Sequence, residues 1–432
     1  MPTRRRNCAT RLRRPAARVP PRRSAWRRAD ALAGLDHVAV VGASLAGTRA
    51  AEALRREGFD RRLTIIGDEV HRPYQRPPLS KQFLAGDWDR SKVDLRVRDL
   101  DADVRLGTVA EQLDLQAREV AVRGPDGHER IGFDGLIIAT GCQPRSLPGG
   151  PDRGGMVGVH TLRTVDDSLA LRVALDANPT VGVVGAGFIG SEVASTCRRR
   201  GLEVTLIDPL SAPLERALGR RIGDVVGKLH IDHGVRLRTG VSVRGLVGNG
   251  HVEGIRLDDG SLVPANLVVL GLGVTPAVKW LEGSAVHLDD GVVCDARCFV
   301  EGATNVVAAG DVARWFHPSS GRHLRVEHFD NAGAQAGSAA RALLAGKDAQ
   351  PYDPVLSFWS DQYEVKLQLL GMPELGDSVE VVEGDVSQPR FIAAYEREGR
   401  TVAILASNQM SRLHSYRTVV EKRLAFPPKA PA

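Results

Sequence analysis

The chain has 432 residues, of which 43% are hydrophobic, and a formal net charge of +6. This length is enough for two or three packed domains, because a single core rarely grows past about 250 to 300 residues. No apolar run in the sequence approaches the roughly 20 residues that a membrane-spanning helix needs, so no membrane partner is expected.

The positive charge is concentrated in an arginine-rich arm at the N-terminus. Residues 1–33 contain eleven arginines and one acidic residue, so the rest of the chain is net acidic. The arm lacks the apolar core of a secretory signal, and its composition predicts disorder. A passive tail, an over-extended start, a transit peptide and a polyanion-binding arm all stay open. Nucleic acid is not the expected partner of the acidic body.

The first predicted unit carries the glycine fingerprint VVGASLAG after a β-branched strand at residues 37–41. Three small residues allow a tight turn and a close approach of the backbone to phosphate: Gly42, Ser44 and Gly47. A predicted helix follows, and then a second apolar strand, residues 63–66, closes on Asp68 and Glu69. This order predicts a dinucleotide site in which N–H groups at a helix N-terminus meet a pyrophosphate. Tight packing without a ligand is the alternative.

A second fingerprint, VVGAGFIG, follows residues 181–184 and has the same context. Its glycines are Gly185, Gly187 and Gly190. The next apolar strand, residues 204–207, closes on Asp208. Each unit continues through short strands with an Asp-Gly turn to a final apolar strand, so the chain contains an internal repeat. One polypeptide is therefore predicted to carry two dinucleotide sites.

The remaining elements complete an α/β fold with two Rossmann-like domains and a C-terminal α/β domain. A strand at residues 305–309 ends at Gly310 and Asp311, and a helix is predicted over residues 331–344. The third region begins at Pro354. Its predicted elements are three strands, SFWSDQYEVKLQLLG, FIAAYERE and TVAILASN, and a helix over residues 412–423.

The cysteine pattern argues against disulfide chemistry. The chain has five cysteines, no C-x-x-C motif, and no cysteine in the segment RPYQRPPLSK after the first acids. Cys294 and Cys298 lie late in the chain, and we interpret them as small hydrophobic residues rather than a redox pair. An odd count without a framework is typical of a reducing cytoplasm. No metal site is expected.

At this point the motifs carry a family resemblance. VVGASLAG, GDE-x₃-PY-x-RPPLSK, IIATG, VVGAGFIGSE, LGLGVTPA, AAGDVA, EHFDNA and FWSDQY occur in this order over nearly the whole chain. The set resembles the FAD-dependent, NADH-linked ferredoxin reductases that serve bacterial cytochrome P450s and Rieske ring-hydroxylating dioxygenases. The resemblance implies a two-part FAD domain, an inserted NADH domain and a C-terminal reductase domain, which follow the arm. The expected ranges are 1–35 for the arm, 36–150 and 275–350 for FAD, 151–274 for NADH, and 351–432 for the C-terminal domain.

The resemblance also implies which residues line the two cofactors. Those expected at FAD are Gly42, Ser44, Gly47, Asp68, Glu69, Arg76, Lys81, Ala139, Thr140, Gly141, Asp311, Glu327 and Trp359. Those expected at NADH are Gly185, Gly187, Gly190, Glu192, Asp208 and Gly273. Phe329 stands where family members often have tryptophan. For Trp359, Asp361 and Gln362, domain packing and contact with the flavin edge stay open.

Two of these assignments concern chemistry. Lys81 and Glu192 resemble a catalytic Lys/Glu pair held beside flavin N5, where the lysine would stabilise negative charge and the glutamate would orient the carboxamide. Their alternatives are a surface lysine and a helix-favouring glutamate. Asp208 is expected to accept the ribose hydroxyls of NADH and to repel a 2′-phosphate, because the three residues that follow it carry no cation.

The expected activity is transfer of a hydride from NADH to FAD and of single electrons to a small acidic [2Fe-2S] ferredoxin, which feeds a P450 or a Rieske oxygenase. We expect a cytoplasmic monomer or weak homodimer. Two alternatives share the fold: an NADH oxidase or monodehydroascorbate-type reductase, and an NADH-sensing protein resembling apoptosis-inducing factor. The first alternative would turn over without ferredoxin, and the second would bind nucleic acid through its arm.

Overall fold

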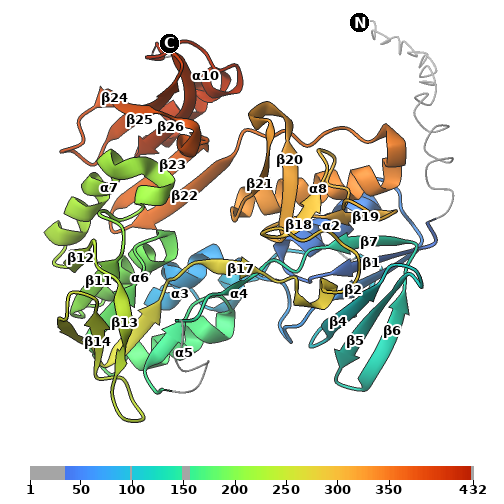
Figure 1. The fold of residues 1–432 in the computed structure, drawn as a ribbon, viewed down its shortest axis with the longest axis horizontal. Helices are drawn as coiled ribbons and strands as arrows, with labels where there is room; N and C mark the ends of the chain where they lie inside the picture. Colours follow the sequence, from blue (N-terminus) through green and yellow to red (C-terminus); the bar gives the residue numbers. More distant parts are fainter. Residues whose placement is uncertain (1–34, 98–99, 148–155, 430–432) are drawn as a thin grey trace, which may run out of the picture.

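The structure is a computed structural model that describes residues 35–97, 100–147 and 156–429. The predicted arm, apart from Leu35, lies outside the described residues. Among the described helices, none is long and apolar enough to cross a membrane. Three five-stranded sheets dominate the molecule, and Figure 1 shows them as a right-hand body, a lower-left body and an upper-left body.

The first sheet is parallel and has the strand order β19-β7-β1-β2-β3. Its strands are β1 (His37–Val41), β2 (Arg62–Ile66), β3 (Asp103–Arg105), β7 (Gly135–Ile138) and β19 (Val306–Ala308). Two helices pack against each other beside it, α2 (Leu45–Arg56) and α8 (Phe329–Ala345). Strands buried on both faces need continuous apolar runs, which explains the valine- and isoleucine-rich sequences of β1, β2 and β7.

Two further sheets belong to this right-hand body, whereas the short helices that follow β2 pack against the lower-left body (Figure 1). One is the antiparallel meander of β4 (Val109–Asp114), β5 (Glu119–Gly124) and β6 (Gly127–Gly132). The other is formed by β18 (Val292–Cys294), β20 (Ala313–His317) and β21 (Arg322–Arg325). The segment after β2 forms the short helices η1 (Pro77–Ser80), α3 (Gln82–Ala85) and α4 (Arg90–Val93). The predicted turn at Asp126 and Gly127 thus joins β5 to β6.

The second sheet repeats this plan, with strand order β12-β11-β10-β16-β9, all parallel. Its strands are β9 (Val159–Thr161), β10 (Val181–Val184), β11 (Val204–Asp208), β12 (Arg236–Thr239) and β16 (Leu267–Leu270). Its helices are α5 (Val165–Leu175), α6 (Phe188–Arg199) and α7 (Glu215–Asp232). Its meander is β13 (Val243–Val247), β14 (Gly254–Leu257) and β15 (Leu262–Pro264).

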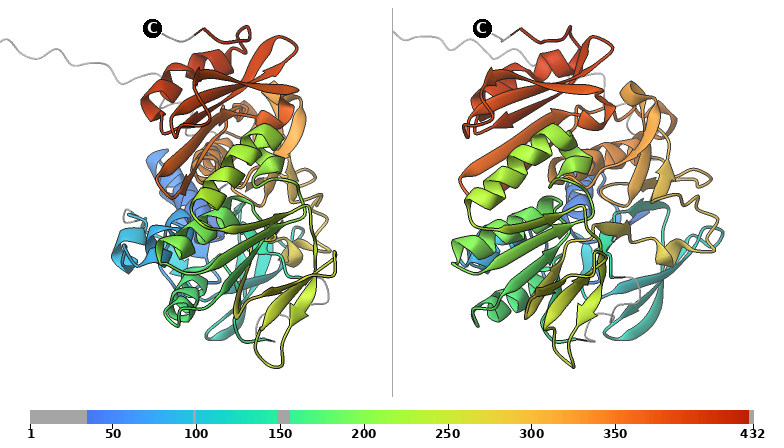
Figure 2. Two further views of the ribbon diagram at one scale, coloured as in Figure 1. Left: turned by 90° about the vertical axis from the view of Figure 1, so that its left-hand side faces the viewer. Right: turned by 60° about the vertical axis from the view of Figure 1, so that its left-hand side comes forward.

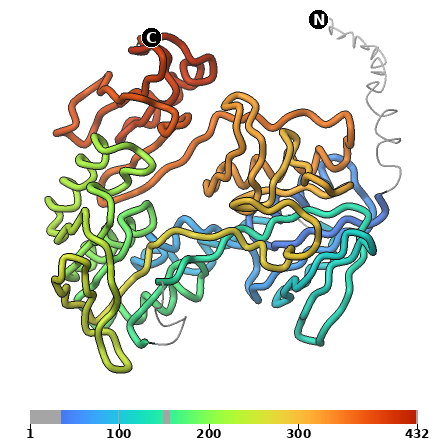
Figure 3. Tube along the Cα trace, viewed as in Figure 1, coloured from blue at the N-terminus to red at the C-terminus, as the bar shows by residue number. Residues whose placement is uncertain are grey.

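A two-stranded antiparallel ribbon connects the first two bodies. β8 (Cys142–Pro144) leaves the first body and pairs with β17 (Val274–Pro276), which returns to it. The tube in Figure 3 shows these two segments running side by side between the left and right halves. The second Rossmann unit is therefore inserted into the first, since the chain returns after it to add β19 to the first sheet.

The third sheet is antiparallel and has the order β22-β23-β26-β25-β24. Its strands are β22 (Ser357–Gln362), β23 (Val365–Gly371), β24 (Ser378–Gly384), β25 (Phe391–Arg397) and β26 (Arg400–Ser407). Leu218, Ile222 and Val226 of α7 pack on one face of this sheet. Two short helices pack on the other face, α9 (Met410–Ser415) and α10 (Arg417–Glu421). Figure 2 shows α7 directly against this sheet.

Three predictions for this third region were wrong in detail. SFWSDQYEVKLQLLG forms two strands rather than one, because the chain turns at Tyr363, which adopts a positive φ of 55°. The helix predicted over residues 412–423 is divided between α9 and α10. β24 was not predicted at all. The α/β fold class with two Rossmann-like sheets and a separate C-terminal part is confirmed.

The buried thiols agree with the interpretation of the cysteines as small hydrophobic residues. Cys142, Cys197, Cys294 and Cys298 are all free and buried. Burial raises the pKa of the Cys294 thiol well above its usual range, so this thiol stays protonated and unreactive.

Candidate active site

A large cavity of about 1230 Å³ lies where the three bodies meet. It begins at the first fingerprint and the carboxyl ends of β1 and β2, and it extends to the first turn of α6, the N-terminus of α8 and strand β22. Typical small-ligand pockets have volumes of about 300 to 1000 Å³. The cavity therefore suits a ligand longer than most metabolites.

The structure places almost every residue that was predicted at FAD on the wall of this cavity. The predicted residues that line it are Gly42, Ser44, Asp68, Glu69, Arg76, Lys81, Ala139, Thr140, Gly141, Asp311, Glu327 and Trp359. Gly47 is the exception, because it is buried inside α2. A Cβ atom on Gly47 would lie 1.7 Å from the carbonyl oxygen of Gly42, so this glycine is needed for the turn itself.

The first fingerprint forms a cradle at one end of the cavity. Gly42 has a φ of +116°, and a Cβ atom there would lie 2.1 Å from the carbonyl oxygen of Ala139. The next residues lead to Ser44, the N-cap of α2, whose side chain makes no capping hydrogen bond. The N–H groups of the first helical turn are thus directed to the cavity wall. Such a helix N-terminus suits a phosphate group.

A chain of charged groups continues from this cradle. Glu69 Oε1 accepts a hydrogen bond from Arg76 Nη2 at 2.6 Å, and Glu69 Oε2 accepts one from the Tyr74 hydroxyl at 2.5 Å. Arg163 Nη2 lies 2.9 Å from Asp311 Oδ2. Burial raises the pKa of Tyr74, so its hydroxyl remains a donor. The contacts of Tyr74 and Arg163 were not predicted, because they join side chains whose partners local sequence does not specify.

Lys81 and Glu192 meet deep in the wall of the cavity. The distance from Lys81 Nζ to Glu192 Oε2 is 2.9 Å, and the two side chains are 9% and 5% exposed. Lys81 follows the short helix η1, and Glu192 lies in the first turns of α6, within the second fingerprint unit. The alternative of a surface lysine is therefore wrong, because Lys81 is buried. The ion pair joins the two predicted dinucleotide sites.

Aromatic rings surround the same end of the cavity. The ring centroids of Phe188 and Phe358 are 4.6 Å apart, and those of Phe329 and Trp359 are 5.9 Å apart. All four residues line the cavity. His328 also lines it, and burial lowers the pKa of its imidazole to about 4, so the ring is neutral near pH 7. Flat apolar surfaces of this kind suit the faces of an aromatic cofactor.

Trp359, Asp361 and Gln362 of β22 were each expected either to pack between domains or to contact the flavin edge, and they differ in the structure. Trp359 lines the cavity. Gln362 is fully buried and donates from Nε2 to Ser360 Oγ at 3.3 Å, so it belongs to the packing. Asp361 lies 3.6 Å from Lys366 Nζ on the neighbouring strand.

Unsatisfied polar atoms on the wall test whether FAD fits. Arg163 Nε, Trp280 Nε1 and His328 Nδ1 are buried and have no hydrogen-bond partner within the described ranges. All three residues line the cavity. Buried polar atoms normally have partners, and the phosphate, hydroxyl and ring carbonyl oxygens of FAD would supply acceptors. Together with the cradle and the volume, these residues fit FAD.

The second fingerprint has the same backbone geometry as the first. Gly185 has a φ of +98°, and its Cβ would lie 2.2 Å from the carbonyl oxygen of Gly271. A Cβ on Gly190 would lie 1.9 Å from the carbonyl oxygen of Gly185. Gly187 differs, because it is the N-cap of α6 and a Cβ there would meet no atom within 4 Å. Open space beside a helix N-terminus is what a bound pyrophosphate requires.

Asp208, at the end of β11, holds the loop of the second fingerprint through hydrogen bonds. Its Oδ2 accepts a hydrogen bond from the Ala186 N–H at 2.6 Å, and its Oδ1 accepts one from the Leu210 N–H at 2.8 Å. Each carboxylate oxygen has two lone pairs, so each can still accept one hydroxyl. The side chain is 9% exposed and is therefore held rigidly beside the fingerprint.

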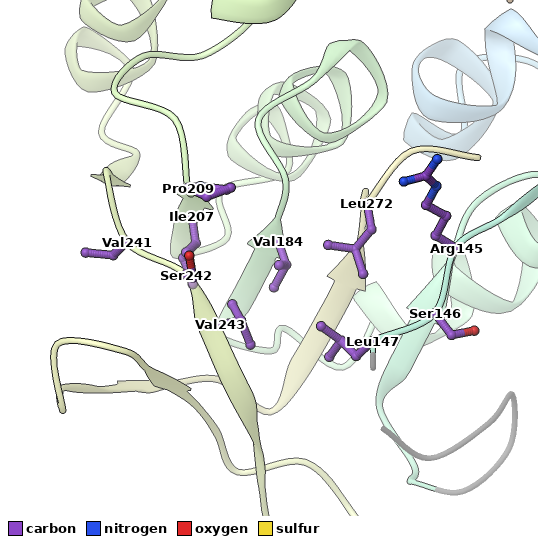
Figure 4. A pocket seen from close by; sticks show the side chains of 10 residues that line it. All are labelled: Arg145, Ser146, Leu147, Val184, Ile207, Pro209, Val241, Ser242, Val243 and Leu272. Carbon is purple, nitrogen blue, oxygen red and sulfur yellow. The ribbon is translucent and has the colours of Figure 1, made fainter. Parts of the chain in front are cut away.

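A smaller cavity of about 280 Å³ lies next to Asp208 (Figure 4). Figure 4 shows its lining, which includes Val184, Ile207, Pro209 and Leu272 from the ends of β10, β11 and β16. These residues are direct neighbours of Gly185, Asp208 and Gly273, which are not part of the lining themselves. Gly273 has a φ of +81°, and its carbonyl oxygen accepts from the Arg145 N–H at 3.0 Å, so it starts the ribbon.

Comparison with known proteins establishes the family. Residues 36–336 match the family described as pyridine nucleotide-disulphide oxidoreductase, and residues 357–432 match the one described as reductase C-terminal. The chain belongs to the pyridine nucleotide-disulphide oxidoreductase family. It is an oxidoreductase of the kind that uses FAD and NAD(P)H.

Individual relatives agree with this assignment. The ferredoxin–NAD(+) reductase component of the anthranilate 1,2-dioxygenase system of Burkholderia cepacia is 37% identical over 86% of this chain and 91% of its own. Putidaredoxin reductase of Pseudomonas putida is 32% identical over 91% of this chain and 93% of its own. The structure of a covalent putidaredoxin reductase–putidaredoxin complex matches with a TM-score of 0.85 and 31% identity, over 90% of this chain and 94% of that one.

Proposed function

We propose that this chain is an FAD-dependent NADH:ferredoxin reductase that supplies electrons to a cytochrome P450 or a Rieske dioxygenase. The buried ion pair of Lys81 and Glu192 carries the proposal, because it joins the large cavity to the helix of the second fingerprint. The relatives named as ferredoxin reductases, and the putidaredoxin reductase complex, support the choice of electron acceptor. No redox-active cysteine pair is needed for this chemistry.

We assign FAD to the large cavity, with residues 36–150 and 275–350 as its domain. When bound, FAD takes two electrons from NADH as a hydride and gives them up one at a time. In this assignment the first fingerprint and α2 hold the pyrophosphate, Glu69 and Asp311 accept hydrogen bonds from hydroxyl groups, and Arg76 donates to an oxygen of the cofactor. Lys81 places a positive charge beside the ring, and the aromatic side chains exclude water from its faces.

We assign NADH to the second fingerprint, with residues 151–274 as its domain. In this assignment Gly187 lets the pyrophosphate approach α6, and Asp208 accepts the ribose hydroxyls with its remaining lone pairs. Glu192 orients the carboxamide at the junction of the two sites. Phe188, in the first turn of the same helix, lines the route to the large cavity. The positioning of the two cofactors by these residues would then supply most of the acceleration.

The proposed partner is a small acidic [2Fe-2S] ferredoxin, and residues 351–432 are the proposed reductase domain beside it. Such electron-transfer complexes have small, transient interfaces that charge steers. A cytoplasmic location and a monomeric or weakly dimeric state complete the proposal. The free, buried cysteines among the described residues support a reducing compartment.

The glycines of the second fingerprint provide a paired test of the NADH site. Gly187→Ala is expected to preserve the fold and to raise the Michaelis constant for NADH, because the new methyl group has room in the protein but not beside a pyrophosphate. Gly190→Ala is expected to lower the unfolding midpoint, because its Cβ would collide with the backbone at Gly185. NADH titration and thermal unfolding measure the two effects. An unchanged Michaelis constant in Gly187→Ala would contradict the assignment.

The proposed function itself is tested with artificial and natural acceptors. With NADH, the FAD-loaded protein is expected to reduce ferricyanide rapidly and cytochrome c slowly. Adding a [2Fe-2S] ferredoxin from the host should accelerate cytochrome c reduction at least tenfold, because the ferredoxin takes electrons singly from the cavity edge. The acceleration should weaken as salt rises from about 0.05 to 0.5 M and the Debye length shortens.

The same experiment separates the proposal from its enzymatic alternative. Equal cytochrome c rates with and without every ferredoxin of the host, together with rapid NADH-dependent oxygen consumption, would favour an NADH oxidase. A ferredoxin-dependent rate that does not change with salt would contradict a charge-steered interface.

A further inference from the structure

The C-terminal sheet reaches the buried ion pair through one hydroxyl group. Ser360 lies in β22, is fully buried, and donates from Oγ to Glu192 Oε1 at 2.7 Å. The other oxygen of the same carboxylate, Glu192 Oε2, accepts from Ser80 Oγ at 2.5 Å and lies 2.9 Å from Lys81 Nζ. The two carboxylate oxygens are therefore held from opposite sides by segments 280 positions apart in the chain.

One face of α6 makes all of these contacts. Glu192, Ser195 and Thr196 are separated by three and four positions and therefore project from the same side of the helix. The Tyr363 N–H donates to Ser195 Oγ at 2.7 Å, and Thr196 Oγ1 donates to the Ser80 carbonyl oxygen at 2.8 Å. This helix face is thus the junction of the FAD segment, the NADH unit and the C-terminal sheet.

We propose that Ser360 is a positioning residue for hydride transfer. This inference rests on the proposed function. Lys81 and Ser80 contact only Oε2, so without Ser360 the carboxylate would be held at one oxygen and restrained less firmly. The hydroxyl of Ser360 fixes the second oxygen, and hence the plane of the carboxylate that faces the cavity. The C-terminal sheet is in this way a part of the hydride-transfer site as well as a neighbour of the proposed ferredoxin interface.

The test compares two buried serines of the same sheet. Ser360→Ala removes the hydroxyl on Glu192, and Ser407→Ala removes one that donates to the Pro389 carbonyl oxygen, outside the wall of the large cavity. Flavin reduction by NADH is followed anaerobically by stopped flow over a range of NADH concentrations. In Ser360→Ala we expect a limiting rate about tenfold lower and a nearly unchanged NADH affinity. Ser407→Ala should match the wild type, and Ser360→Thr should recover most of the rate.

A second measurement does not depend on activity. In a double-mutant cycle of urea unfolding, Ser360→Ala and Glu192→Gln should have non-additive effects on the midpoint, whereas Ser407→Ala and Glu192→Gln should be additive. Additive effects in both cycles, or a limiting rate of Ser360→Ala equal to that of Ser407→Ala, would overturn the proposal. If NADH fails to reduce the flavin of the wild-type protein, the proposed function fails, and the cycle still decides whether Ser360 holds Glu192.

Discussion

Replacing Lys81 with methionine is expected to slow flavin reduction by NADH by at least a hundredfold. One preorganised charge or donor beside a reacting group contributes about 10²- to 10³-fold to a rate. The change also leaves Glu192 buried without its cation, and breaking a buried pair in this way costs about 3 to 5 kcal/mol of stability. Stopped-flow absorbance of the flavin and thermal unfolding measure the two effects separately.

An exposed ion pair provides the control for this prediction. Lys228 Nζ lies 2.7 Å from Asp232 Oδ2, and the two side chains are 69% and 54% exposed. Exposed pairs contribute about 0 to 1 kcal/mol, so Lys228→Met should leave the rate and the midpoint close to the wild-type values. Glu192→Gln removes the charge of the other partner of the buried pair, and it should also slow flavin reduction by NADH. A Lys81→Met enzyme that reduces its flavin at the wild-type rate would contradict the catalytic role of the pair.

Removing the carboxylate of Asp208 is expected to raise the Michaelis constant for NADH by about 10- to 150-fold. One hydrogen bond to a charged group contributes about 1.5 to 3 kcal/mol, and the expected range corresponds to a net loss of one such bond. Discrimination against NADPH should shrink in Asp208→Ala, because the negative charge that repels a 2′-phosphate is gone. Steady-state kinetics with both nucleotides measures the change.

The hydrogen bonds of Asp208 call for a second variant. Because the carboxylate also accepts from the Ala186 and Leu210 N–H groups, alanine loosens the fingerprint loop as well as the ribose contact. Asp208→Asn retains one acceptor for the loop and removes the charge. Compared with Asp208→Ala, it should therefore weaken NADH binding less and improve NADPH binding more. Asp232→Ala, an exposed acid at the end of α7, is the control. An unchanged NADH to NADPH ratio in both Asp208 variants would contradict the assignment of this strand end.

Much of the Rossmann framework could be predicted from local sequence. The predicted strands at residues 37–41 and 181–184 coincide with β1 and β10. Both are short apolar runs that end at a glycine with positive φ, so the strand type and its end are encoded within a few residues. The C-terminal sheet was harder, because the turn at Tyr363 has no glycine, and β24 alternates polar and apolar residues on an edge.

The features of the candidate site also fall into those that local sequence predicts and those that only the tertiary structure reveals. The sequence by itself determined the fingerprints and their terminal acids, because each is a local arrangement of strand, turn and helix with its own steric requirement. Lys81 and Glu192 could be selected by resemblance, but their ion pair, the link from Arg163 to Asp311 and the hydroxyl of Ser360 were decided by tertiary structure alone. These contacts join segments of the chain that are 111 to 168 positions apart, and no local rule relates such segments. The two contacts of Glu192 arise from the way α6 packs against the segment after β2 and the C-terminal sheet.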